Sequence, residues 1–343
     1  MSAALRAPFP WFGGKSRAAS LVWEALGNVA NFCEPFFGSG AVLLARPHAP
    51  RLETVNDASR FLANFWRAVA HDPDAVALHC DWPVNETDLH SRHRWLVAQL
   101  PALAKLLDAD PEAHDAKIAG WWCWGACAWI GTGWCDEGGR PLSAQVPHLS
   151  TEGQGIHRKL PHLGNAGRGG HRAPRELPQQ LPHMADGGRG VHRDHHEGLR
   201  AYIGDLSARL RRVRVACGDW SRVCTDSVTW RHGVTGVFLD PPYAEGAQQY
   251  AAGGTGTGLS ADVRAWAIEA GKRRDMRLVL AGLEGEHDAL QRRGWRVVEW
   301  KANGGYGNAA GNENRHRERL WFSPHCLSVN EARSLFDSDG DAA

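Results

Sequence analysis

Short apolar runs that end abruptly at polar or glycine-containing turns recur along this chain. Runs of this length, bounded by turn residues, are typical of buried β-strands. Residues 29–42 add a strand, a glycine turn and a short helix at about 39–45. The remaining pattern predicts strands at about 52–56, 213–217, 237–239, 277–281, 295–301 and 319–322.

Apolar residues spaced three or four apart predict helices between these strands. The clearest candidates cover residues 58–70, 86–107 and 262–272, together with a face that starts near Glu197 and runs from Leu199 to Val213. A chain that alternates strands with helices favours an α/β fold built on a mostly parallel sheet. Residues 250–259 are rich in glycine and are expected to form a loop.

Composition limits the possible functions only weakly. The chain has 343 residues, and its 39 Lys and Arg almost balance its 38 Asp and Glu, so the overall charge does not indicate a nucleic-acid partner. Its eight cysteines form no C-x-x-C pair, which favours reduced thiols. Neither a signal peptide nor an apolar run long enough for a membrane span is recognisable. We therefore expect a soluble, cytoplasmic protein that binds no membrane.

The most informative motif follows the strand at 237–239. Asp240, Pro241, Pro242 and Tyr243 place a carboxylate, a rigid backbone and an aromatic ring at the carboxyl end of a strand, where open α/β sheets bind ligands. Because proline carries no N–H, carbonyls near it remain available as acceptors. Acceptors beside a ring that can stack on a base suit chemistry on an exocyclic amine. A tight turn capped by Asp240 is the alternative.

Two earlier glycine-containing segments suggest a cofactor site. Trp11 and Lys15 flank a Gly-Gly pair, which would let the backbone approach a ligand. Glu34, Phe36, Gly38 and Gly40 lie at a strand–turn–helix junction of the kind that accepts an adenosine-containing cofactor. The spacing differs from the G-x-G-x-x-G of dinucleotide-binding proteins, which argues against NAD.

Asp57 follows the second strand and is placed to accept hydrogen bonds from ribose hydroxyls. It is equally suited to cap the helix that follows, and both roles can hold together.

In this order the motifs resemble those of the Dam-like, alpha-group adenine-specific DNA methyltransferases that contain DPPY. The resemblance covers roughly residues 7–70 and 213–323. It implies a Rossmann-like, S-adenosyl-methionine-dependent methyltransferase sheet that methylates the exocyclic N6 amine of adenine in double-stranded DNA. It also implies that Trp11 and Lys15 hold the methionine end of the cofactor, that Phe36 to Gly40 hold the adenosine turn, and that Asp57 holds the ribose. An acidic position ahead of DPPY, here Asp219, is expected near the target base.

The resemblance also predicts the domain organisation. Residues 1–71 and 201–327 would form the catalytic domain. Residues 72–200 would form an inserted, partly helical and partly irregular target-recognition region, and residues 328–343 a disordered tail. Five tryptophans between residues 121 and 134 are expected to pack inside this region rather than to stack on bases. We expect a monomer or weak dimer.

An imperfect Pro-His repeat fills residues 147–193, and its three copies end at Arg158, Arg172 and Arg193. Residues 158–214 carry 12 Lys and Arg against five Asp and Glu, which is the local charge of a DNA-contacting segment. These three arginines are therefore candidate DNA-binding residues. The histidines permit an interpretation as zinc ligands, but none of the copies pairs them with cysteine at ligand spacing, so we expect no metal. A solvated loop without a partner is the other alternative.

Two rival classes of function remain open at the level of sequence. The same fold could act on the N4 amine of cytosine or on RNA, or methylate glutamine in a protein, although serine or asparagine at position 240 would favour these substrates more than Asp240 does. A non-catalytic DNA-binding module is the rival from another class. A role within a restriction-modification pair and a role as a solitary methylase are both compatible with the sequence.

Overall fold

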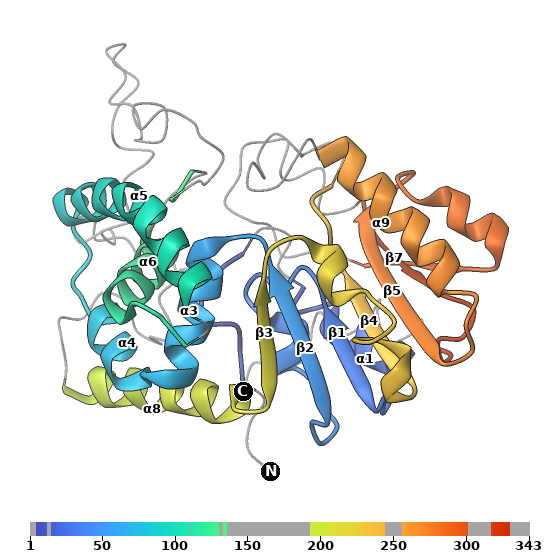
Figure 1. The fold of residues 1–343 in the computed structure, drawn as a ribbon, viewed down its shortest axis with the longest axis horizontal. Coiled ribbons are helices and arrows are strands. Elements are labelled where there is room, and N and C mark those ends of the chain that lie inside the picture. Colours follow the sequence, from blue (N-terminus) through green and yellow to red (C-terminus); the bar gives the residue numbers. More distant parts are fainter. Residues whose placement is uncertain are drawn as a thin grey trace, which may run out of the picture. The chain divides into compact units, whose positions relative to one another are not determined.

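The computed structural model describes residues 5–11, 15–110, 112–129, 133–135, 193–243, 256–300 and 317–329, with only the backbone described at 193–197 and 256–257. The chain divides into two compact units (Figure 1). The first comprises residues 1–7, 11–59 and 212–343, and the second comprises residues 8–10 and 60–211. Among the described residues, no helix combines the length and the apolarity that a membrane crossing requires.

The first unit is built on one sheet whose strands lie in the order β3-β2-β1-β4-β5-β7-β6 (Figure 1). The first five of these strands are parallel, and β7 runs antiparallel to both β5 and β6. The predicted Rossmann-like α/β fold is thereby confirmed. The strands are β1 (Asn31–Glu34), β2 (Leu52–Asp57), β3 (Val213–Cys217), β4 (Thr235–Leu239), β5 (Met276–Leu283), β6 (Arg296–Glu299) and β7 (Glu318–Phe322).

The strand order reverses between β1 and β4. From β1 the chain adds β2 and then β3 on one side, and afterwards returns to place β4 on the other side of β1. Cys33 of β1 pairs with Val237 of β4, so Glu34 and Asp240 both lie where these two parallel strands end. Such a reversal opens a crevice at the carboxyl ends of the strands, where sheets of this kind bind ligands.

Helices α1 (Ala19–Leu26) and α9 (Gly256–Ala270) pack against β5 of this sheet. The short helix α2 (Ala41–Leu44) follows β1, and the described part of the unit also contains three 3-10 turns. The turns are η2 (Trp220–Val223), η3 (Trp230–His232) and η5 (Asp288–Arg293). Every residue of β4 is buried, as expected for a parallel strand covered on both faces.

The second unit is helical where it is described. Its helices are α3 (Arg60–His71), α4 (Pro73–Cys80), α5 (Glu86–Ala109), α6 (Ala116–Ala128) and α8 (Arg193–Leu210). Asp72, Asn85 and Asp115 accept hydrogen bonds from backbone N–H groups in the first turns of α4, α5 and α6, which explains where these helices begin.

Aromatic rings form much of the core of this second unit. Phe9 packs edge-on against Phe65 and Trp122, with ring centroids 5.3 and 4.9 Å apart. Trp124 and Trp129 are buried against Leu89 of α5. These tryptophans pack inside the unit, as the sequence predicted.

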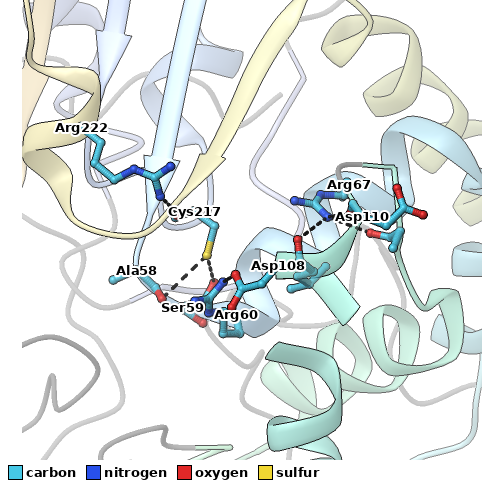
Figure 2. Close-up of polar contacts among 10 residues, drawn as sticks. Ala58, Ser59, Arg60, Arg67, Asp108, Asp110, Cys217 and Arg222 are labelled. Carbon is cyan, nitrogen blue, oxygen red and sulfur yellow. Dashed lines mark hydrogen bonds and ion pairs between the residues drawn. The ribbon is translucent and has the colours of Figure 1, made fainter. Parts of the chain in front are cut away.

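Ion pairs and carbonyl contacts fix the end of α5 within the same unit. Arg67 donates to the carbonyl of Asp110 at 3.1 Å, and Arg60 forms an ion pair with Asp108 at 2.7 Å (Figure 2).

Three predicted boundaries were wrong. Val213 does not continue the helical face of α8, because its backbone pairs with Glu53 and opens β3. Helix α8 begins at Arg193 rather than near Glu197, since its first turn is polar and shows no apolar period. Helix α9 begins at Gly256, inside the expected loop, because Leu259 packs on the core and so ties this glycine-rich turn to the helix.

Candidate active site

The DPPY motif lies where the sequence predicted it. The buried strand β4 ends at Leu239, and Asp240 is the first residue beyond it, with 19% of its side chain exposed. Pro241 is buried, whereas Pro242 and Tyr243 are half-buried. The motif therefore offers its carboxylate and its ring at the rim of the sheet.

Lys15 connects this motif to two other parts of the chain. Its ammonium lies 3.0 Å from Asp240 Oδ1, 2.8 Å from the hydroxyl of Tyr243 and 3.5 Å from Glu318 Oε2. The Tyr243 hydroxyl also lies 3.3 Å from Glu318 Oε2 and 3.5 Å from Asp240 Oδ1. One cation thus holds two carboxylates and a phenol in a closed network, and its side chain is only 4% exposed.

Burial and charge act against each other at these groups. Burial opposes the charge on Lys15, but the attraction of Asp240 and Glu318 outweighs it and raises the pKa of Lys15. Burial also raises the pKa of Asp240 and of Glu318, although Lys15 pulls both values down. The ammonium therefore stays charged, while the carboxyls bind protons more readily than they would in water.

Glu34, at the end of β1, is a third buried acid beside this network. Burial, and after it the charge of Asp240, holds the pKa of Glu34 well above its ordinary value. Its Oε2 atom has no hydrogen-bond partner among the described residues. Because leaving a buried polar atom unpaired is costly, such an atom indicates a place for a ligand's donor.

The glycine turn that follows β1 lies beside the Trp11 ring. A Cβ at Gly38 would come within 2.5 Å of the Trp11 ring, and the φ of +48° at this residue is a left-handed conformation that favours glycine. Gly40, with a φ of 72°, starts α2. Trp11 and Gly38, predicted from separate motifs, are thus in direct contact.

Asp57 closes this turn from β2. Its Oδ2 accepts the N–H of Gly38 at 2.9 Å, and its Oδ1 accepts the N–H of Ser59 at 3.0 Å, just before α3. Asp57 therefore orders the chain ahead of this helix, one of the two roles predicted for it. A carboxylate has about four acceptor positions, so it can still bind ribose hydroxyls. Burial raises the pKa of Asp57.

The loop after β3 completes the rim. The amide of Asn56 donates to the carbonyls of Pro35 and Gly218, both at 3.0 Å, and so ties the ends of β1, β2 and β3 together. The thiol of Cys217 points to the carbonyls of Ala58 and Ser59 (Figure 2).

An aromatic pair and a capping acid lie in the same part of the unit. Phe36 stacks on Trp220 with ring centroids 6.3 Å apart. Asp219 is exposed, and it caps η2 by accepting the N–H of Ser221 at 2.9 Å. Its predicted approach to the target base stays a prediction.

Not every predicted residue can be placed. Arg158 and Arg172 lie outside the described residues, and Arg193 is described only as the first backbone position of α8. Within the described ranges, no group of three or more His, Cys, Asp or Glu residues is arranged to hold a metal ion.

Sequence reasoning missed Glu318 and Trp300. The ring of Trp300 has its centroid 5.5 Å from the Lys15 ammonium, and Glu318 opens β7. The one signal for Glu318 was an acidic residue shortly ahead of the apolar run Leu320 to Phe322.

A family model matches part of the chain. Residues 11–93 match the family model of the D12 class N6 adenine-specific DNA methyltransferases. This segment contains Trp11, Lys15, the glycine turn and Asp57, and it stops before Asp240. No curated protein matches the chain.

Proposed function

We propose that this chain, a DNA adenine-N6 methyltransferase by its family match, takes its methyl group from S-adenosylmethionine at the edge where β1 and β4 end. The observation that carries the proposal is the arrangement of Asp240 and Tyr243, held by Lys15 beside the buried acid Glu34. The family match already includes DNA adenine as the substrate. The donor and the role of each residue are our inference.

The residues at this edge fit the proposed donor. The unpaired Oε2 of Glu34 suits the ammonium of the methionine part. Gly38 and Gly40 add no side chains to this turn, the Trp11 ring lies against Gly38, and Asp57 provides acceptors for the ribose. When bound, S-adenosylmethionine supplies an electrophilic methyl group.

Asp240 and the Pro241 carbonyl would receive the adenine amine. Lys15 and Tyr243 both contact Asp240 through Oδ1, so its second oxygen, Oδ2, can accept a hydrogen of the amine. Accepting those hydrogens shifts electron density toward the nitrogen and orients it for in-line attack. Tyr243 would stack on the adenine, which must leave the duplex to reach this edge.

The test is methyl transfer from labelled S-adenosylmethionine to double-stranded DNA, with the modified base identified by mass spectrometry. We expect N6-methyladenine. N4-methylcytosine, a preference for RNA, or cofactor binding without transfer would each contradict the proposal. Expression in a methylation-free host, followed by single-molecule sequencing, identifies the modified sites.

On the DNA side, the proposal extends to the Pro-His repeat. If Arg158, Arg172 and Arg193 bind phosphates, removing any one of them should flatten the slope of log affinity against log salt by roughly 0.9. Replacing all three with Ala should therefore flatten the slope by about two to three units, while cofactor affinity stays unchanged. An unchanged slope would instead support the alternative interpretation, in which the repeat is a solvated loop without a partner.

A further inference from the structure

Glu318 contacts two members of the DPPY site but cannot itself reach a base easily. Its Oε2 lies 3.3 Å from the Tyr243 hydroxyl and 3.5 Å from the Lys15 ammonium, and its side chain is only 8% exposed. The described contacts of its carboxylate are thus with groups that hold the site, and little of its side chain reaches the surface.

We propose that Glu318 is a positioning residue for methyl transfer: it anchors the Tyr243 ring by its hydroxyl and holds Lys15 against Asp240. This inference rests on the proposed function, because it assigns Tyr243 and Asp240 to the target base. It adds a residue from β7 to a site otherwise built from residues 11–57 and 240–243.

The contacts of Lys15 support this role. An ammonium has three N–H donors. Among the described residues, three acceptors lie within 3.5 Å of it, namely Asp240 Oδ1, the Tyr243 hydroxyl and Glu318 Oε2. Replacing Glu318 by Ala removes one of these acceptors, so Lys15 is held less firmly against Asp240 and Tyr243.

The backbone of Glu318 makes it a firm anchor. It pairs with Leu283 of β5 in the antiparallel ladder, and its carbonyl accepts the N–H of Trp300 at 3.5 Å. Residues on strands hold a site more accurately than residues on loops do. Asp240 and Tyr243 follow a strand end, so an anchor on a neighbouring strand limits their movement.

A purely structural role is the competing explanation, in which Glu318 only neutralises a buried lysine. Both explanations predict some loss of stability when Glu318 is replaced. They differ in turnover, because only a positioning role predicts a fall in kcat with little change in the KM for the cofactor.

The experiment compares Glu318→Gln and Glu318→Ala with the control Glu299→Gln. Gln keeps an acceptor for Tyr243 but removes the charge, whereas Ala removes both. Glu299 lies on β6, pairs with Arg319 at 3.2 Å and is 78% exposed, so it is an acid on a neighbouring strand outside the site. Kinetics on DNA are measured with the folded fraction determined for each variant.

We expect kcat to fall by about 10-fold for Glu318→Gln and by about 10²-fold for Glu318→Ala, because small misplacements of reacting groups have effects of this size. The KM for S-adenosylmethionine should change much less, and the control should remain within about twofold of the unmodified chain. Equal kcat in all three variants would overturn the proposal while leaving the proposed function intact.

A second readout does not require activity. Acetic anhydride labels unprotonated amines, and mass spectrometry reports each lysine separately. In the cofactor-free protein, Lys15 should react far more slowly than Lys272, whose side chain is 61% exposed. Glu318→Ala should accelerate labelling of Lys15 alone, and the control should not.

Unchanged labelling in Glu318→Ala would overturn the contact on which the proposal rests. If the unmodified chain does not methylate DNA at all, the proposed function fails, and the labelling still decides whether Glu318 holds Lys15.

Discussion

Two buried ion pairs lie at opposite ends of the same sheet, and they are built differently. Arg46 meets Glu53 at 2.9 Å near the start of β2, with 1% and 0% of the two side chains exposed. Arg46 also donates to the Val29 carbonyl at 2.8 Å. Here one cation faces one carboxylate.

At the carboxyl ends of the strands, carboxyl groups outnumber the described cation. Lys15 faces both Asp240 and Glu318. Glu34 is a third acid nearby, and burial together with the charge of Asp240 raises its pKa. The pair at the amino end therefore matches each charge with one opposite charge. Among the described residues, the cluster at the other end has three acids for one lysine, as expected of a site completed by substrates.

The largest effect on stability should come from removing Glu53 of the Arg46–Glu53 pair. Glu53→Ala leaves the Arg46 guanidinium buried without its carboxylate, and breaking such pairs typically costs about 3–5 kcal/mol of unfolding free energy. Urea unfolding followed by circular dichroism measures this loss. The exposed pair between Arg200 and Asp74 is the control, since Asp74→Ala should cost far less stability than Glu53→Ala. A loss as small as that of the control would show that the buried pair contributes little.

Asp240→Ala should instead act on chemistry. Lys15 keeps Glu318 as a carboxylate partner, so the fold should persist, while loss of one oriented acceptor lowers the rate by on the order of 10²–10³-fold. Single-turnover methyl transfer at saturating cofactor and DNA measures the effect. Turnover near that of the unmodified chain would remove Asp240 from the mechanism.

A smaller effect is expected at Asp57. Hydrogen bonds to a charged group contribute roughly 1.5–3 kcal/mol, so Asp57→Ala should weaken S-adenosylmethionine binding by at least about tenfold. DNA affinity at saturating cofactor should hardly change. Because Asp57 also accepts the N–H groups of Gly38 and Ser59, calorimetric titration must be paired with a melting curve. Unchanged cofactor affinity would leave Asp57 with its structural role alone.

The smallest effect is a gain of stability at Glu34. The folded pKa of Glu34 lies above its ordinary value, so the native state binds the extra proton between these two values, and stability falls as the pH rises through that window. Glu34→Gln removes this dependence. It should raise the unfolding free energy at neutral to alkaline pH by on the order of 1 kcal/mol, and it should weaken cofactor binding. Unfolding curves at several pH values test the sign, which an unchanged or steeper pH dependence would contradict.

The strands were predictable because most contain a short group of apolar, often β-branched residues between turns. Strand β3 was predicted with its observed bounds, and β2 and β4 were predicted within one or two residues. Burial of β4 on both faces leaves no alternation of polar residues that could confuse the pattern. Helix starts were less predictable, since polar or glycine-rich first turns such as that of α9 lack an apolar period.

The site was predictable only in part. Motif residues such as Asp240 and Gly38 have chemistry that fits a recognisable local pattern. Glu318 acquires its role from the pairing of β7 with β5, which places it beside Lys15. No local pattern contains that contact, because it depends on the register between strands far apart in the sequence.

The network around Lys15 also has a consequence for synthesis of the chain. Lys15 is separated from Tyr243 by 228 residues, and Tyr243 is separated from Glu318 by another 75. At typical translation speeds the ribosome needs on the order of tens of seconds to cover such a length. Lys15 is present without Asp240 for the first part of that interval, and without Glu318 until its end. A nascent chain therefore cannot complete this network until β7 has emerged.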